Sequence, residues 1–118
     1  MNIEQEIQAK GLTAPRITPA DIEASVVKEV YFTAADGIAG HALAWRDYSA
    51  TINTEHQLLT FCVLTLRNGF TVTGESACAS PENFSTEIGR KVARQNAVAK
   101  IWPLLGYELR TRLAGGAA

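Results

Sequence analysis

The sequence predicts an α+β domain: one or more N-terminal helices, an antiparallel β-hairpin, and a long C-terminal helix packed on that hairpin. Asn68-Gly69 separates two apolar runs rich in β-branched residues, the strongest short signal for a β-hairpin. A capping residue followed by proline opens both residues 18–32 and residues 80–106, as at helix starts. With 118 residues, 47% of them apolar, the chain has the size and composition of a single domain, residues 1–118, with its own core.

Two helices are expected before the hairpin. Residues 2–10 form a short helix with isoleucines four positions apart, closed by Gly11. Residues 18–32 form the second, with Thr18 as cap and Pro19 in the first turn. Its expected apolar stripe is Ile22, Val26 and Val30. Residues 33–56 show no clear period, and residues 1–17 and 114–118 are expected to be peripheral or flexible.

A two-residue turn at Asn68-Gly69 fixes a hairpin register in which Arg67 faces Phe70 and Cys62 faces Glu75. Side chains alternate along strands, so each face has its own set. The expected core face carries Phe61, Val63, Phe70 and Val72. The other, half-apolar face carries Thr60, Cys62, Leu64, Leu66, Thr71, Thr73 and Glu75. Such a face suits a second layer or a subunit contact.

The long helix is expected within residues 80–106, starting after Ser80 or later after Ser85 or Thr86, and ending at Gly106. It is apolar on two sides. One side gathers Phe84, Ile88, Val92, Val98, Trp102 and Leu105, and the other Ala93, Ala97, Ile101 and Leu104. A helix with two apolar sides, like the half-apolar hairpin face, predicts a homo-oligomer. Residues 107–113 fit either a third strand or one more helical turn.

Charge and cysteine content limit the compartment and the partners. The net charge is −1, divided into −4 over residues 1–66 and +3 over residues 67–118, so an anionic ligand is expected in the second half. Cys62 and Cys78 do not form a disulfide framework or a metal motif. No membrane-length apolar run or signal peptide is recognisable, which favours the reducing bacterial cytoplasm.

No catalytic pattern stands out among the reactive residues. The two histidines, His41 and His56, lie in the stretch without a clear period, where a solvated or packed role is far more common than catalysis. No nucleophile elbow, triad order or phosphate-loop lysine accompanies them. The sequence therefore predicts a protein that is not an enzyme, with no catalytic residue, metal site or cofactor.

A basic group marks the best candidate for a binding site. Arg90, Lys91 and Arg94 lie in the first turns of the long helix, where cations oppose the helix dipole and are not expected to stabilise the fold. In the simplest interpretation, the nearby carboxylates of Glu82 and Glu87 balance these positive charges. In the second interpretation, a bound anion balances them. The ligand-binding residues expected on the second interpretation are Arg67, Asn68, Phe70, Asn83, Arg90, Lys91 and Arg94. Phe70 and Phe84 are more typical of a core than of a stacking platform.

The stretches "LTFCVLTLRNGFTVTGESACASPENF" and "EIGRKVARQNAVAKIWPLLGYEL" resemble a small phage and prophage protein family. It is named after gene product forty-nine of coliphage N-four and gene sixty-six of phage Sf-six. The resemblance covers about residues 20–113 and is strongest over 58–109. It implies a phage accessory gene acting in the bacterial host cytoplasm.

By analogy with small phage counter-defence proteins, we expect a sponge of the anti-CBASS or anti-Thoeris kind. Such a protein binds and sequesters a cyclic-nucleotide or NAD-derived signal without cleaving it. One alternative is a module similar to double-stranded-RNA-binding domains, whose helix N-terminus meets phosphates. Against it stand the net charge and the lack of an evident three-stranded sheet before the helix. A protein-binding inhibitor of a host enzyme is the other alternative.

Overall fold

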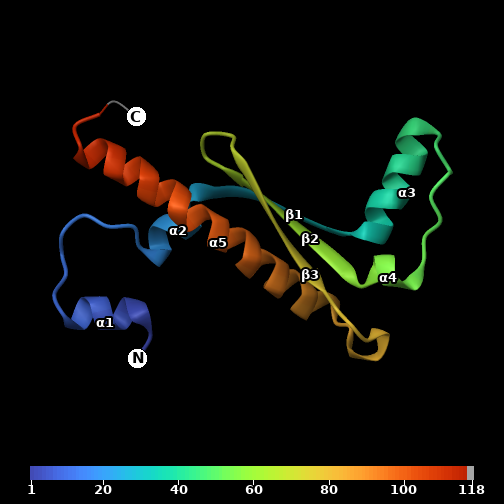
Figure 1. Cartoon of the computed structure of the whole chain (residues 1–118), viewed down its shortest axis with the longest axis horizontal. Helices are drawn as coiled ribbons and strands as arrows, with labels where there is room; N and C mark the ends of the chain where they lie inside the picture. The colour runs from blue at the N-terminus through green and yellow to red at the C-terminus, as the bar shows by residue number, and fades with distance from the viewer. Residues whose placement is uncertain (117–118) are drawn as a thin grey trace.

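A computed structural model of the chain describes residues 1–116 and confirms the α+β class (Figure 1). In chain order the elements are α1 (Ile3–Ala9), α2 (Pro19–Ser25), β1 (Val26–Thr33), α3 (Ala34–Trp45), α4 (Thr54–Gln57), β2 (Leu59–Leu66), β3 (Thr71–Ala77), the 3₁₀ turn η1 (Pro81–Asn83) and α5 (Thr86–Leu113). Within residues 1–116, no helix combines the length and the apolar character needed to cross a membrane.

The sheet has three antiparallel strands in the order β1-β2-β3, one more than the sequence predicted. The helix expected over residues 18–32 ends at Ser25, and the chain continues as β1. That expectation was wrong because Val26 and Val30 match a helical stripe by spacing alone. The run "VVKEVYF" is dominated by β-branched and aromatic residues, which favour a strand once β2 offers a pairing edge.

The hairpin closes with three loop residues, not two. The Leu66 N–H donates to the Phe70 carbonyl at 2.8 Å, and the Gly69 N–H donates to the Leu66 carbonyl at 2.9 Å. Gly69, with φ of 89°, takes the left-handed conformation of a three-residue hairpin loop. The predicted register was therefore wrong by one residue, and Cys62 faces Gly74 instead of Glu75.

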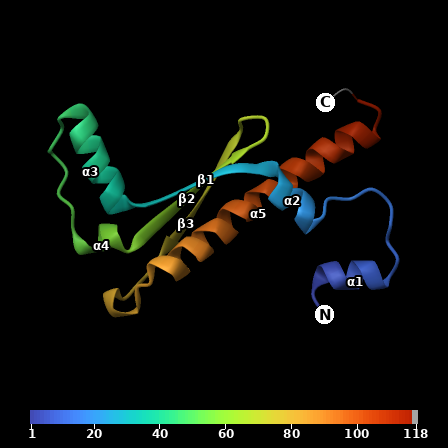
Figure 2. The same ribbon diagram turned by 180° about the vertical axis from the view of Figure 1, so that it is seen from behind.

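The core lies on one face of the sheet, beneath α2 and α5 (Figures 1 and 2). It consists of Ile22, Cys62, Leu64, Leu66, Val72, Ala93, Ala97 and Ile101. The β2 residues of the half-apolar face are thus the buried ones, and the assignment of Phe61, Val63 and Phe70 to the core face was wrong. Because the register differs by one residue, Val72 lies on the buried face with Leu64, whereas Thr71, Thr73 and Glu75 lie on the opposite, exposed face. The physical reason is the small-residue side of α5: Ala93 and Ala97 allow its backbone to approach the sheet closely, next to Gly74 of β3.

Helix α5 starts at the later of the two predicted positions and passes the predicted stop. Ser85 caps it, its side-chain oxygen accepting from the Ile88 N–H at 3.2 Å. Gly106 does not end the helix, because half-buried Leu105 and Leu109 still pack on the body, so residues 107–113 are helical. Pro103 lies inside the helix, and Ile88, which the sequence placed on one of its apolar sides, remains 63% exposed.

Two segments extend away from this body. The chain leading to α2 passes near the C-terminal end of α5 with α1 lying farther out, and α3 with α4 extends from the other end of the sheet (Figure 1). Residues 33–56, unreadable in the sequence, hold this second extension, and none of the residues of α3 or α4 is buried.

Candidate ligand-binding site

A hollow of about 340 Å³ opens where α5 begins, between that helix, the start of α3 and the end of the sheet. We call it the α5 hollow. Its lining residues are Phe32, Thr33, Ala35, Asp36, Gln57, Thr60, Phe84, Thr86 and Arg90. Three hydroxyls, two aromatic rings and one guanidinium thus surround a volume at the lower end of the range for small-molecule sites.

Local capping interactions position the hollow's polar groups. Thr33 caps α3: its hydroxyl accepts from the Asp36 N–H at 3.1 Å, while its own N–H donates to the Asp36 carboxylate at 2.9 Å. Thr60 lines the hollow from β2 although only 3% of its surface is exposed. Gly89 leaves room beside it, since a Cβ there would lie 3.0 Å from the Thr60 hydroxyl. The wall formed by α5 therefore depends on a residue without a side chain.

Arg90 is the cation of the α5 hollow. Its Cζ atom lies 5.5 Å from the centroid of the Tyr31 ring, within cation–π range. Within residues 1–116, no carboxylate oxygen lies within 4.0 Å of its guanidinium nitrogens. The side chain is exposed, so its hydrogen-bond donors can reach a ligand in the hollow. Among the predicted site residues, Arg90 is the one that lines the α5 hollow.

Arg94 has a different environment. Its Nη2 and Nη1 atoms donate to the two Glu23 carboxylate oxygens at 2.8 and 3.0 Å, and its Nε donates to Glu29 at 2.6 Å. These bonds lower the pKa of both carboxyl groups and raise the pKa of Arg94. Tyr31 also donates to Glu29, at 2.9 Å. Arg94 therefore joins α5 to α2 and β1, a structural role, whereas nothing in the sequence indicated that it stabilises the fold.

The structure separates the remaining predicted residues from the α5 hollow. Lys91 pairs with Glu87 at 3.0 Å on the exposed side of α5, and Asn83 is exposed in η1. The positive charge of Lys91 is thus balanced by Glu87, as in the simplest interpretation of the sequence. Neither side chain lines the α5 hollow.

Arg67, Asn68 and Phe70 lie at the opposite end of the sheet, where they line smaller hollows with Leu105 and Glu108. Leu105 is fifteen residues along α5 from Arg90, a distance of about 22 Å at the rise of an α-helix. The expectation that Arg67 reaches the same place as Arg90 was wrong, because β3 places the hairpin loop and the helix start at opposite ends of the sheet.

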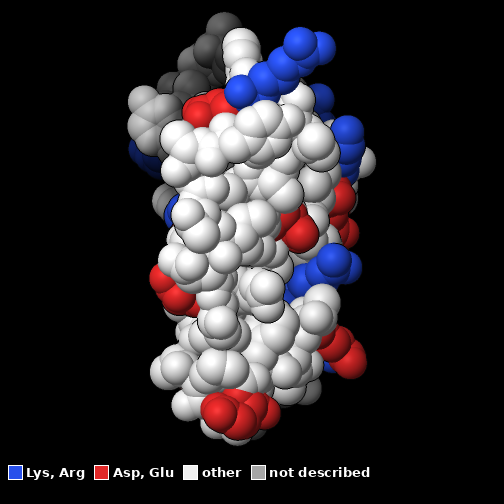
Figure 3. All heavy atoms as spheres, turned by 90° about the vertical axis from the view of Figure 1, so that its right-hand side faces the viewer, with Lys and Arg blue, Asp and Glu red and all other residues white. Residues whose placement is uncertain are grey.

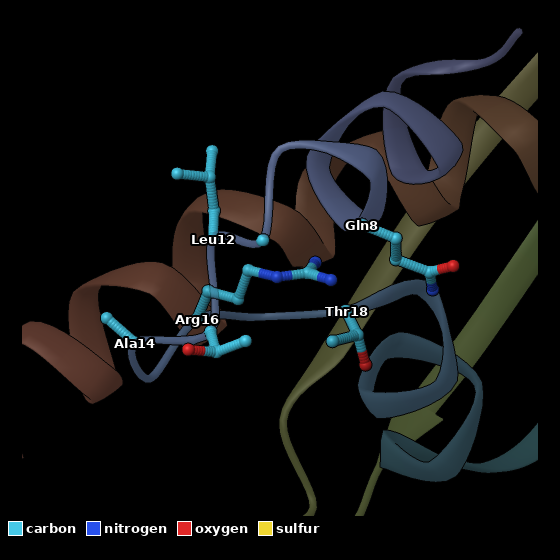
Figure 4. A pocket seen from close by; sticks show the side chains of 7 residues that line it. Gln8, Leu12, Ala14, Arg16 and Thr18 are labelled. Carbon is cyan, nitrogen blue, oxygen red and sulfur yellow. The ribbon is translucent and has the colours of Figure 1, made fainter.

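A larger hollow of about 430 Å³ lies near the N-terminus and is lined by Arg16 and by residues around Gly11 (Figure 4). Figure 4 shows the Arg16 side chain extending towards α1. There its Nη1 and Nη2 atoms donate to both Glu4 carboxylate oxygens, at 2.9 and 2.6 Å. The charge of Arg16 is neutralised by this pair, so the larger hollow is the weaker candidate for an anion.

Histidines and cysteines contribute nothing to the α5 hollow. His41 contacts Asp47 at 3.2 Å on the exposed surface, and the Nδ1 atom of His56 accepts from the Asn53 N–H at 2.9 Å. Both cysteines are free thiols, Cys62 buried and Cys78 half-buried. Among residues 1–116, no group of three histidine, cysteine or acidic side chains has the geometry to hold a metal ion.

Sequence reasoning missed most of the hollow's lining. Phe32 and Thr33 fell at or beyond the end of an expected helix, and Thr60 was assigned to a face without a site. The β-branched and aromatic content of residues 26–33 was the one signal that could have identified β1. Nothing in the sequence predicted that the start of α3 would lie beside the start of α5 and line the hollow.

The fold and the α5 hollow define a small α+β protein with a three-stranded sheet, helices on one face, and a polar hollow at the start of its long helix. The chain belongs to the phage protein family of N4 Gp49 and phage Sf6 gene 66, whose family model matches residues 17–113. The match includes the whole α5 hollow and excludes most of the lining of the N-terminal one. Neither the curated proteins nor the solved structures contain a match.

Proposed function

We propose that this phage-family protein binds a phosphate-bearing small molecule of the nucleotide type in the α5 hollow and sequesters it without cleaving it. The observation that carries the proposal is the exposed guanidinium of Arg90 beside the start of a 28-residue helix, in a hollow with hydroxyl and aromatic groups. The positive end of a helix dipole and an arginine both favour a phosphate.

The lining residues match the chemistry of a nucleotide. Thr33, Thr60 and Thr86 offer hydroxyls to phosphate or ribose oxygens, and the rings of Phe32 and Phe84 offer apolar surface to a base. Sequestration is favoured over turnover because the lining lacks histidine, cysteine and lysine, and its one carboxylate, Asp36, already accepts a hydrogen bond from the Thr33 N–H in the cap of α3. A role against a host nucleotide signal accords with the phage family.

Calorimetry on a panel of cyclic di- and trinucleotides and NAD-derived cyclic products tests this proposal. Arg90→Ala removes a charged hydrogen-bond donor and should weaken binding by about 1.5–3 kcal/mol, or roughly ten- to a hundredfold. Lys91→Ala is the matched control, since it removes the adjacent cation outside the hollow. Absence of binding to every member of the panel would refute the proposal, and consumption of a bound nucleotide would show an enzyme.

One observation favours a second candidate, the double-stranded-RNA-binding module. Apart from α3 and α4, which are inserted between β1 and β2, the order α2-β1-β2-β3-α5, with both helices on one face of an antiparallel sheet, is the order of elements in those domains. The three-stranded sheet that the sequence did not reveal is therefore present. The charge of the chain still argues against RNA binding, because Glu23 and Glu29 neutralise Arg94 and the net charge is −1.

Salt dependence and the same two variants separate the candidates. Binding to an RNA duplex should fall steeply with salt and vary little with sequence, since each neutralised phosphate releases counterions. Arg90→Ala and Lys91→Ala should then weaken binding similarly, because a duplex contacts the outer surface of α5 as well as its end. A nucleotide in the hollow should respond to Arg90→Ala alone.

A further inference from the structure

The second face of the sheet is apolar along β2 and the adjoining part of β1, while β3 contributes the polar residues Thr71, Thr73 and Glu75 to it. The residues of β2 that point away from α5 are Leu59, Phe61, Val63 and Thr65, and those of β1 include Val30 and Phe32. Phe32 and Phe61 stack with ring centroids 5.5 Å apart, and Val30 is 39% exposed. An antiparallel sheet with one face in water normally alternates apolar and polar residues, whereas continuous apolar strands are typical of sheets covered on both faces.

Helix α3 is a second apolar element, and within residues 1–116 it packs mainly against α4 and the ends of β1 and β2. It contacts the body at its first turn, where the Phe32 ring lies 3.9 Å from the position a Cβ would take at Gly37. None of its residues is buried, and Leu43 and Trp45 are 74% and 75% exposed. Single exposed apolar residues are ordinary, but a twelve-residue helix with only Asp36 and His41 as ionisable groups lacks the polar face of a solvated helix.

The radius of gyration and the accessible surface of the chain both exceed those of a compact monomer of this length, as expected if a second chain covers part of its surface. Its radius of gyration is 18.5 Å, against about 13.5 Å for a compact domain of this length. Its accessible surface is 8177 Å², roughly 1,900 Å² more than the scaling for a monomer of this mass gives. The extended α1 segment and the α3–α4 extension share this excess. A standard interface buries only about 800 Å² per partner.

We propose that the open sheet face and α3 of one chain pack against the same surfaces of a second copy, related by a two-fold axis. Each α3 then covers the partner's Val30, Phe61 and Val63, and each sheet covers the partner's Leu43. A single two-fold axis therefore buries the open sheet face and α3 of both chains in one isologous interface.

The charge distribution permits this association. In the part of β2 that faces outwards there is no charged residue, and the nearest charges on the neighbouring strands are Lys28 and Glu75, of opposite sign. Figure 3 shows the end of the molecule that carries α3, where uncharged side chains make up most of the surface. The uncharged centre of the sheet face can therefore be buried against a second copy without burying a charge of β2.

The outer side of α5 is the competing surface within the described chain. Ile88 is 63% and Trp102 is 39% exposed there, but the ion pair between Lys91 and Glu87 lies across the same side. Burying it between two copies requires desolvation of both charges. On the open sheet face the charged residues Lys28 and Glu75 lie on the flanking strands, and the β2 residues at its centre are uncharged.

Sedimentation velocity on the full chain and two matched variants tests the proposal. The wild type should be a dimer at about 50 μM. Leu43→Glu places a carboxylate in the interface and should raise the dimer Kd by about 30-fold or more, the scale of an interface hot spot. Ile88→Glu makes the same chemical change on the outer side of α5 and should leave the dimer Kd within about twofold of the wild type.

Circular dichroism keeps the result interpretable. Leu43 is exposed in the single chain, so Leu43→Glu should retain the wild-type spectrum at concentrations where both proteins are monomeric. A wild type that stays monomeric at about 100 μM would overturn the proposal. Loss of the dimer in Ile88→Glu together with its retention in Leu43→Glu would also overturn it, by assigning the interface to α5.

Discussion

Gly74 controls how closely α5 approaches the sheet, and Gly74→Ala is the sharpest test of the fold. A Cβ at this position would lie 2.9 Å from the carbonyl carbon of Asn96, and closer still to the carbonyl oxygen of Ala93 and the amide nitrogen of Ala97. All three atoms belong to the backbone of α5, so no side-chain rotation relieves the overlap. The helix as a whole must move away from β3.

The cost follows from that displacement. Restoring ordinary van der Waals separation requires α5 to retreat by about 1 Å. The retreat loosens the contacts of Ala93 and Ala97 with the sheet and stretches the 2.7 Å hydrogen bond from the Asn96 side chain to the Glu75 carbonyl. Overpacking costs about 1–3 kcal/mol, and backbone obstruction places this case in the upper part of that range. We expect a loss of about 2–3 kcal/mol in unfolding free energy, or roughly 8–12 °C in Tm.

Urea denaturation followed by circular dichroism measures this loss, with Gly106→Ala as the matched control. Gly106 lies inside α5 with no atom within 4 Å of a Cβ position, so alanine there should stabilise the protein by about 0.5–1 kcal/mol through helix propensity. If Gly74→Ala unfolds within about 0.5 kcal/mol of the wild type, the close approach of α5 to β3 is incorrect.

Three further outcomes are expected. Arg94→Met should lower the unfolding free energy by about 1–2 kcal/mol, because it removes charged hydrogen bonds to Glu23 and Glu29 while keeping the aliphatic contacts; a denaturation midpoint equal to that of the wild type would contradict this. Since Arg94 lowers the pKa of both carboxyl groups, their stabilisation is present above about pH 4.5 and lost as the pH falls further, so wild-type stability should drop more steeply between about pH 5 and 3 than that of the variant; parallel pH profiles would count against the network. A thiol reagent should modify Cys78 in the native protein and Cys62 only after denaturation, because Cys62 is fully buried and burial raises its pKa; rapid modification of both thiols, or of neither, would conflict with the described burial.

The sequence determined the features that depend on neighbouring residues. The α+β class, the hairpin at Asn68-Gly69, the cap of α2 at Thr18 and the existence of the long helix all followed from turn and capping chemistry, which acts over about four residues. The family resemblance, which depends on residue identity alone, was confirmed over residues 17–113. The basic residue best placed for a ligand, Arg90, also came from the sequence, through its unfavourable position near a helix start.

Tertiary structure decided what depends on distant partners. Strand β1 exists because β2 provides a pairing edge for residues 26–33, and spacing alone could not distinguish that strand from a helical stripe. The buried face of β2 was selected by the small residues of α5, which admit a close approach only on the side of Gly74. Arg90 and Arg94 are four residues apart on one helix, yet one faces the α5 hollow and the other is held by Glu23 and Glu29. Local sequence cannot separate such neighbours, because an arginine's role is set by the carboxylates that other elements bring within its reach.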